Sequence, residues 1–238
     1  MSFSALVIGY GSIGKRHADI LNSMDAVENV TVLSGQTDLP YITIKKLEEI
    51  PELDPNYIVI ASNTVLHLEQ LVFLVNNLRG KKILVEKPLF DSFQNCGIND
   101  NEVFVGYNLR FHPIIKKIKK EIKNKDLWNI QLNCSSFLPN WRPARDYRET
   151  ASAKELTGGG VLLDLSHELD YALWIAGAID LNYVLNEKIS DLEIDTDDLL
   201  IIFGKSGNAH LQICLNYFTR KPIRQIIIDG DGISIQAN

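Results

Sequence analysis

The chain has 238 residues, of which 45% are hydrophobic, so it can form one large domain or two small ones with cores of their own. Its formal net charge of −6 argues against nucleic acid as the main partner, because phosphate binding requires a basic face. No apolar run reaches the length of a membrane span and the first residues carry no basic leader, so we expect a cytoplasmic protein with no membrane partner.

The first part of the chain alternates short β-rich runs with helical patterns. The pattern predicts strands at Ala5–Gly9, Val30–Leu33, Tyr57–Ala61, Lys82–Glu86 and Val103–Tyr107. It predicts helices at Lys15–Asn22 and Val65–Leu78, and a shorter one near Leu47–Ile50. Such alternation indicates an α/β domain built on a doubly wound parallel sheet.

The second part reads differently. A helix is predicted at Pro113–Lys123, where isoleucines recur at helical spacing and the lysines form the solvated face. One strand, Leu127–Ser136, and a loop, Leu138–Thr150, precede a helix at Val161–Ala176. The remaining predicted strands are Leu181–Ile189, Leu199–Phe203, His210–Tyr217, Ile223–Asp229 and Gly232–Gln236. This order predicts an α+β domain with a mostly antiparallel open sheet, and we set the domains at 1–110 and 111–238.

A glycine-rich motif joins the first strand to the first helix: Gly9-Tyr10-Gly11-Ser12-Ile13-Gly14. In this context the first glycine permits a tight turn, the second lets a pyrophosphate approach the backbone, and the third lets the helix pack on the strand. The N–H groups at the helix start then face the phosphates. The motif predicts a dinucleotide-binding loop of a Rossmann domain.

The end of the second strand decides between NAD and NADP. An acidic residue that binds the ribose hydroxyls is expected there, but the strand ends in Ser34-Gly35-Gln36. The absence of a carboxylate slightly favours NADP, because nothing there repels a 2′-phosphate. The absence of a following arginine argues against NADP, because an arginine would bind that phosphate. Lys15 and Arg16 are candidate substitutes or plain surface charges. The cofactor is therefore predicted as NAD or NADP.

A second motif, Glu86-Lys87-Pro88, ends another apolar strand. Because the carboxyl ends of parallel strands meet at the ligand-binding edge, Lys87 is expected there. On its own the motif is equally a solvated strand end stopped by a proline.

Together these motifs resemble those of the Gfo/Idh/MocA family of NAD(P)-dependent sugar oxidoreductases. The resemblance continues through three further motifs: Ala61-Ser62-Asn63-Thr64 with His67, Tyr107-Asn108-Leu109-Arg110-Phe111, and Gly158-Gly159-Gly160 with Asp164 and His167. It implies hydride transfer between a nicotinamide and a carbinol or carbonyl carbon of a sugar or nucleotide-sugar. Family members extend further than Asn238, so the second domain is expected to be incomplete relative to the family.

The resemblance also implies cofactor contacts. Ser62, Asn63 and Glu86 are expected along the cofactor, and Lys87 beside the nicotinamide. His67 is either a ligand contact or a packed, hydrogen-bonded histidine. Thr64 is expected to cap the helix that follows it.

The reaction needs a group that exchanges a proton with the substrate hydroxyl. Lys87, Asp164 and His167 are the catalytic candidates, with His167 the first choice. Asp164 and His167 lie three residues apart, which places them on one face of a continuous helix, although the commoner family spacing is four. The alternative is an Asp–His pair that only anchors a buried helix.

Substrate contacts are expected from Asn108, Arg110, Trp141, Arg142 and Tyr147. Arginines among aromatic residues suit a sugar that carries an acid or a nucleotide diphosphate, and similar runs occur in relatives tied to surface-sugar biosynthesis. The alternatives are an interdomain ion pair for Arg110 and an ordered surface loop or subunit contact for the rest.

A different class of function stays open: a dinucleotide-binding regulatory or interaction protein without turnover. A third option uses transient oxidation to cleave a glycosidic bond. The widely spaced Cys96, Cys134 and Cys214 predict free thiols in a reducing compartment and no metal site. An exposed face of the second sheet predicts a homo-oligomer.

Overall fold

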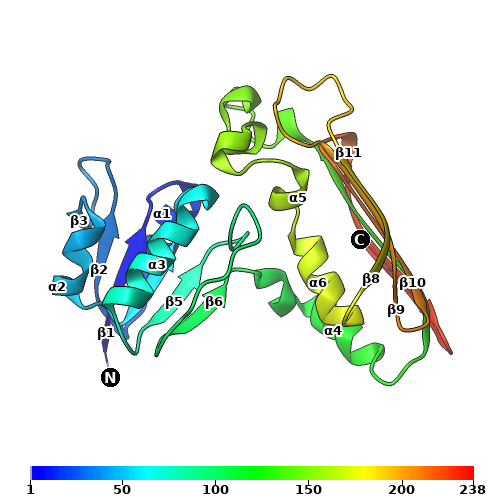
Figure 1. Cartoon of the computed structure of the whole chain (residues 1–238), viewed down its shortest axis with the longest axis horizontal. Coiled ribbons are helices and arrows are strands. Elements are labelled where there is room, and N and C mark those ends of the chain that lie inside the picture. The colour runs from blue at the N-terminus through cyan, green and yellow to red at the C-terminus, as the bar shows by residue number, and fades with distance from the viewer. Residues whose placement is uncertain (1) are drawn as a thin grey trace. The chain divides into compact units, whose positions relative to one another are not determined.

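The computed structural model describes residues 2–238 and divides into two compact units, one ending at Gly106 and one running from Tyr107 to Asn238 (Figure 1). The sequence-based boundary lay after residue 110. The division falls earlier because the turn η3 (Asn108–Phe111) packs on helix α6 (His167–Ala176) of the second unit. Each unit is described by itself below.

The first unit is built on a parallel sheet with the strand order β3-β2-β1-β4-β5-β6. Its strands are β1 (Phe3–Ile8), β2 (Val27–Leu33), β3 (Ile42–Ile44), β4 (Tyr57–Ile60), β5 (Lys82–Val85) and β6 (Glu102–Val105). This is the Rossmann order, in which the chain reverses direction across the sheet between β1 and β4. The predicted fold is confirmed; the short strand β3 was missed.

Helices cover both faces of this sheet. Successive strand residues point to opposite sides, and apolar residues on each side pack against helices. Ala5 and Val7 of β1 pack with Ala18 of α1 (Ser12–Asn22). Leu6 and Ile8 face the other way and share a core with α2 (Ile50–Leu53) and α3 (His67–Asn77). The sheet is therefore buried on both sides, as its continuous apolar strands require.

The second unit contains an open sheet with the order β12-β11-β7-β10-β9-β8. Its strands are β7 (Leu127–Phe137), β8 (Asp180–Glu187), β9 (Leu199–Ser206), β10 (Ala209–Asn216), β11 (Phe218–Gly230) and β12 (Ile233–Ala237). All neighbouring strands run antiparallel except β7 and β10, which are parallel. The predicted mostly antiparallel sheet is confirmed.

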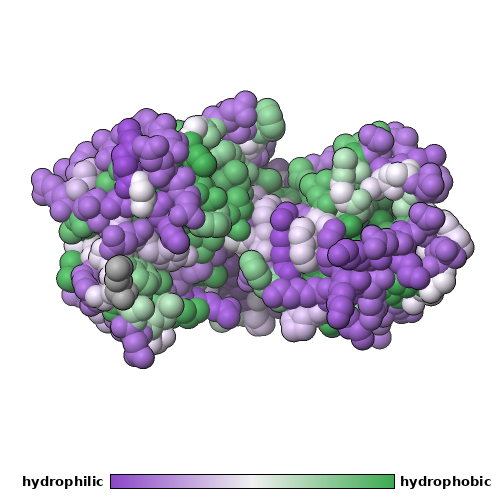
Figure 2. Space-filling model, turned by 90° about the horizontal axis from the view of Figure 1, so that it is seen from below, coloured by the Kyte–Doolittle hydropathy of each residue, from purple (hydrophilic) through white to green (hydrophobic). Residues whose placement is uncertain are grey.

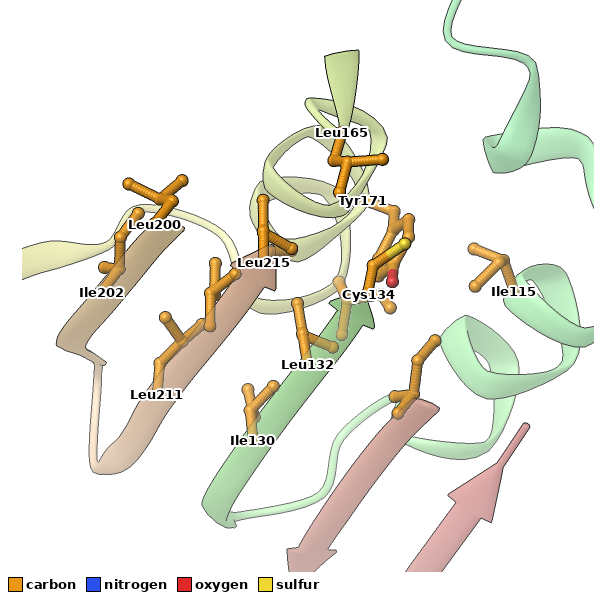
Figure 3. Close-up of a cluster of buried hydrophobic side chains, with 14 of the residues drawn as sticks. Ile115, Ile130, Leu132, Cys134, Leu165, Tyr171, Leu200, Ile202, Leu211 and Leu215 are labelled. Atoms are coloured by element: carbon orange, nitrogen blue, oxygen red, sulfur yellow. The ribbon is translucent and has the colours of Figure 1, made fainter. Parts of the chain in front are cut away.

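Helices cover one face of this second sheet: α4 (Pro113–Glu121), α5 (Val161–Asp164) and α6. Figure 3 shows the core between them, with Ile130 and Leu132 of β7 and Leu211 and Leu215 of β10 pointing toward the helices and Tyr171 of α6. On the opposite face of the sheet lie the strand residues that alternate with these core residues, such as Gln131 of β7 and Gln212 of β10, and many of them are polar.

The predicted continuous helix Val161–Ala176 is wrong, because it breaks into α5 and α6. Leu165 leaves the helical region, with φ −98° and ψ 22°. The hydroxyl of Ser166 donates to the carbonyl oxygen of Leu163 at 2.8 Å. Serine side chains compete in this way with helical backbone bonds, which accounts for a break here.

Several features concern the described chain as a whole. None of the helices in residues 2–238 has the length and apolar character needed to cross a membrane. Within the same residues no three acidic, histidine or cysteine side chains are grouped to hold a metal ion, and the three cysteines are free. On the face shown in Figure 2, polar residues cover most of the surface and hydrophobic residues form smaller patches.

Candidate active site

The turn between β1 and α1 explains each glycine of the first motif. Gly9 has φ +92°, and a Cβ there would lie 2.8 Å from the carbonyl oxygen of Ala61. A Cβ on Gly14 would overlap the carbonyl oxygen of Gly9. Around Gly11, by contrast, a Cβ would meet nothing within 4 Å. The outer two glycines therefore allow close packing, while the middle one borders open space.

The start of α1 is suited to an anion. Gly11 is the N-cap residue and contributes no side-chain hydrogen bond, and the first turn contains no acidic residue. The first N–H groups of α1 and its dipole thus face open space without a competing carboxylate. In the described chain the hydroxyl of Tyr10, in the same loop, is buried without a hydrogen-bond partner. This loop therefore fits a dinucleotide pyrophosphate.

The end of β2 forms a small polar cluster beside this loop. Ser34 is buried, and its hydroxyl accepts from the N–H of Gln36 at 3.1 Å. The Gln36 amide donates to the Tyr10 carbonyl at 3.0 Å, which ties the cluster to the glycine loop. The ammonium of Lys45 donates to the carbonyls of Ser34 and Gln36 at 3.0 and 2.6 Å. Sequence reasoning missed Lys45.

The Glu86-Lys87-Pro88 motif follows β5 directly, with a cis peptide bond between Lys87 and Pro88. The Glu86 carboxylate is 2.6 Å from Nε2 of His17 on α1, and it accepts from the N–H of Lys87 at 3.3 Å. Glu86 thus holds the segment carrying Lys87 to the helix of the glycine loop. We assign Glu86 a positioning role, shared with His17.

The segment after β4 is held to the same motif by His67. His67 is buried, and its Nε2 lies 3.2 Å from the Ser62 carbonyl. Its Nδ1 lies 3.1 Å from the carbonyls of both Pro88 and Leu89. Of the two alternatives for His67, the structure shows the packed, hydrogen-bonded one.

Residues 62–64 differ from expectation in one respect. Asn63 is exposed, and the Ser62 hydroxyl donates to the side-chain oxygen of Gln70 at 2.6 Å. Thr64 is not the helix cap: it is the first residue of the turn η2 (Thr64–Leu66), whose N-cap position is Asn63. The chain enters α3 through this tighter turn, and the N-cap position of α3 itself is Leu66.

In the second unit, Asp164 ends α5 and belongs to a network with two aromatic residues. The Tyr217 hydroxyl donates to the Asp164 carboxylate at 2.6 Å. Tyr217 is fully buried, so its pKa lies well above the ordinary value, first through desolvation and then through Asp164. Trp141 packs edge-on against Tyr217, with ring centroids 5.2 Å apart. Tyr217 was not among the predicted site residues.

His167 begins α6, so it and Asp164 do not share one helical face as the spacing argument required. The His167 ring packs edge-on against Tyr107 at 5.6 Å. Burial raises the pKa of Tyr107. Because the predicted residues flank a helix break, the geometry of the Asp164–His167 pair depends on that break and not on helical periodicity.

The predicted substrate residues have different surroundings. Arg110 binds Asp170 with both arms of its guanidinium, Nε at 2.8 Å and Nη2 at 2.5 Å, which ties η3 to α6 within one unit. The Tyr147 hydroxyl accepts from the N–H of Glu193 at 3.1 Å. Asn108 and Arg142 are exposed. Arg110 therefore forms an ion pair, as the alternative interpretation predicted, but within the second unit, and Tyr147 contacts a neighbouring loop.

A Rossmann unit with a glycine loop open to a phosphate, followed by an α+β unit with an open sheet, is the architecture of a two-unit dinucleotide-binding protein. Residues 3–99 match the family model described as "Oxidoreductase family, NAD-binding Rossmann fold". Over this stretch the chain is similar to the Gfo/Idh/MocA oxidoreductase family, and NAD(P) is the cofactor class that fits its first unit.

The relatives include proteins of several substrate classes. The chain is 26% identical over 202 residues to the rhizopine catabolism protein MocA of Rhizobium meliloti, covering 74% of this chain and 58% of that protein. It is 25% identical over 230 residues to myo-inositol 2-dehydrogenase of Thermotoga maritima, covering 89% and 64%. The chain thus spans less than two thirds of the length of these curated relatives.

Solved structures share the fold. The WlbA dehydrogenase of Bordetella pertussis, in complex with NADH and UDP-GlcNAcA, superimposes with a TM-score of 0.84 at 17% identity, covering 99% of this chain and 78% of that chain. The myo-inositol 2-dehydrogenase of Lactobacillus plantarum gives a TM-score of 0.80 at 17% identity, covering 100% and 76%.

Proposed function

We propose that this protein is an NAD(P)-dependent oxidoreductase that moves a hydride between the nicotinamide and a carbinol or carbonyl carbon of a sugar or nucleotide-sugar. The observation that carries the proposal is the glycine loop, in which Gly11 leaves open space before an uncapped, acid-free helix start. The match of residues 3–99 to an NAD-binding oxidoreductase family supports the same activity.

When bound, the nicotinamide supplies or accepts the hydride. The chain's own residues have the remaining tasks. The first N–H groups of α1 bind the pyrophosphate, and Glu86 and His17 fix the segment that presents Lys87. The Lys87 ammonium orients the reacting oxygen of the substrate as a charged donor.

The proton of the substrate hydroxyl goes to His167, assisted by Asp164. Tyr217 donates to Asp164 at 2.6 Å and so keeps that carboxylate oriented. Trp141, which packs on Tyr217, then offers a ring for stacking on a sugar. Exposed Asn108 and Arg142 are available for polar contacts with the substrate.

The substrate class follows from the names of the relatives. One neighbour holds UDP-GlcNAcA and others are inositol dehydrogenases, so cyclic polyols and nucleotide-sugars are the first compounds to screen. A role in surface-polysaccharide biosynthesis is proposed from the run of arginine and aromatic residues that begins at Trp141.

The substitution Lys87→Ala tests whether Lys87 orients the substrate as proposed. We expect turnover to fall by about two to four orders of magnitude, while NAD(P) affinity in calorimetric titration stays nearly unchanged. Lys82→Ala, an exposed lysine on the strand that leads to the motif, is the matched control and should keep full activity. Undiminished turnover in Lys87→Ala would remove Lys87 from the mechanism.

The alternative is a dinucleotide-binding regulatory or interaction protein. It shares the glycine loop but needs no proton relay. Tight binding of NAD(P) without oxidation or reduction of any screened polyol, sugar or nucleotide-sugar would favour it.

We also propose that the outer face of the second sheet mediates self-association. Tyr183 and Phe203 lie opposite each other on β8 and β9, 53% and 44% exposed, with ring centroids 6.4 Å apart. The neighbouring Ile202 is buried against the helices, so Phe203 points to the uncovered side of the sheet.

A further inference from the structure

We propose that Ser34 and Lys45 form a binding site for the 2′-phosphate of the adenosine ribose, so that this chain prefers NADP(H) to NAD(H). The inference rests on the proposed cofactor site and specifies it further. It is not inherited from the structural neighbours, since those that name a cofactor hold NAD or NADH.

The position of the cluster is set by the fold. In Rossmann domains the group after β2 meets the ribose of the adenosine, and an acid there selects NAD by binding both hydroxyls and repelling a phosphate. Ser34 occupies this position, and Gln36 ties the same turn to the glycine loop through the Tyr10 carbonyl. The cluster therefore stands where the 2′ substituent must lie.

Ser34 is prepared to donate. Its hydroxyl oxygen already accepts from the N–H of Gln36, so its own proton is directed elsewhere. Next to it, Gly35 has no neighbour within 4 Å of the place of a Cβ, which leaves room for a phosphate beside the turn.

Lys45 supplies a positive charge, which the turn Ser34-Gly35-Gln36 itself does not contain. Two of its three ammonium protons go to the carbonyls of Ser34 and Gln36, which fixes the charge over the turn and leaves one proton for a ligand. An ammonium held by main-chain carbonyls is pre-organised, and so it loses little side-chain entropy on binding. It reaches the turn from the segment after β3.

Lys15 and Glu49, two other charged side chains of this unit, have partners of their own. Lys15, a candidate from the sequence, is paired with Asp19 on the same helix. Glu49 accepts from the main-chain N–H groups of Lys45 and Lys46 and so caps the next turn. Asp38 is exposed four residues beyond Ser34, and it is the one carboxylate of the turn that offers a competing, NAD-selecting role.

The experiment is calorimetric titration of the full chain with 2′,5′-ADP and with 5′-AMP, which differ only in the 2′-phosphate, and with NADPH and NADH. We expect the wild type to bind 2′,5′-ADP about 10- to 100-fold more tightly than 5′-AMP, as for one or two charge-assisted hydrogen bonds. Lys45→Ala should abolish most of this ratio and Lys45→Arg should retain it. Lys46→Ala is the matched control, and it should leave the ratio unchanged.

The outcomes separate the two proposals. A wild type that binds NADH at least as tightly as NADPH overturns the 2′-phosphate site but leaves the oxidoreductase standing, and a loss of NADH affinity in Asp38→Asn would then identify Asp38 as the ribose acceptor. An unchanged ratio in Lys45→Ala also overturns the role of Lys45. Absence of binding to all four nucleotides overturns the proposed cofactor site itself.

Discussion

Single residues in the first unit show which parts of the site a sequence can reveal. The glycine loop was predictable because each glycine serves the local backbone: Gly9 and Gly14 lie close to other main-chain atoms, and Gly11 borders open space. Lys45 and Tyr217 were not predictable, because Lys45 reaches its partners from just after the next strand of the sheet and Tyr217 reaches Asp164 on a helix 53 residues away, contacts that residue spacing does not encode.

The contrast between Gly11 and Gly14 gives a testable pair. Gly14→Ala forces a Cβ into the Gly9 carbonyl, and we expect it to lower the free energy of unfolding by about 1–3 kcal/mol and to impair cofactor binding. Gly11→Ala has space for its methyl group, so the fold should remain stable. Its methyl enters the space that the pyrophosphate needs, so we expect NAD(P) affinity to fall roughly 10- to 100-fold.

Thermal unfolding and calorimetric titration of the two variants measure these effects separately. Gly80→Ala, at a loop glycine with φ +67° far along the sequence from the motif, controls for backbone strain without a ligand. If Gly11→Ala binds NAD(P) as the wild type does, the pyrophosphate does not lie against this loop.

At the scale of elements, the sequence predicted nearly every strand and helix but not where the helix carrying the catalytic candidates breaks. Apolar periodicity runs through Val161–Ala176, and only the Ser166 side chain competes with the backbone there. The preceding glycines serve packing, since a Cβ on Gly159 would overlap the Ala151 carbonyl and one on Gly160 the Asp197 carboxylate. Asp197 in turn accepts from the N–H of Leu162 at the start of α5. The Asp197 contacts come from a segment distant in sequence and the Ser166 bond interrupts the helix locally, and neither is visible in the spacing that misplaced the Asp164–His167 pair.

Helix α6 is attached to β11 by an ion pair whose loss should depend on pH. Glu168 is fully buried and accepts from Nε of Arg224 at 2.7 Å. Burial raises the pKa of Glu168, and Arg224 opposes that rise. Arg224→Ala leaves the buried carboxylate uncompensated, so we expect the free energy of unfolding at about pH 8 to fall by about 2–4 kcal/mol.

The sign of the pH effect follows from linkage. A carboxyl group whose pKa is raised in the folded state binds its proton more tightly there, so its contribution to stability is present below the unfolded pKa and is lost as pH rises through the folded pKa. Arg224→Ala raises the folded pKa of Glu168 further. The cost of the substitution should therefore grow from about pH 5 to about pH 8 in denaturant titrations. Glu168→Gln in the Arg224→Ala background removes the charge and should restore most of the stability; a cost that is independent of pH would mean that Arg224 contributes only packing.

For the whole molecule, alternation of strands and helices was sufficient to predict a Rossmann unit followed by an open-sheet unit. The pairing within the second sheet was beyond the sequence, because the parallel neighbours β7 and β10 are separated by the helices and two other strands. The short β3 was missed because three residues give no readable alternation. The sequence therefore predicts that helices pack on sheets in each unit, but only the structure shows which face of the second sheet has no helix on it.

That uncovered face leads to a prediction about assembly. If two copies associate through it, the aromatic pair Tyr183 and Phe203 lies in the interface, and Phe203→Glu buries a charge there. We expect the dimer to weaken about 30-fold or more, as for loss of an aromatic hot spot, and sedimentation equilibrium at micromolar concentration to report a shift toward the monomer. Phe93→Glu, at a side chain that is 92% exposed in a loop of the first unit, is the matched control and should leave the mass unchanged. A wild-type chain that sediments as a monomer at every concentration would show that this face does not bind a second copy.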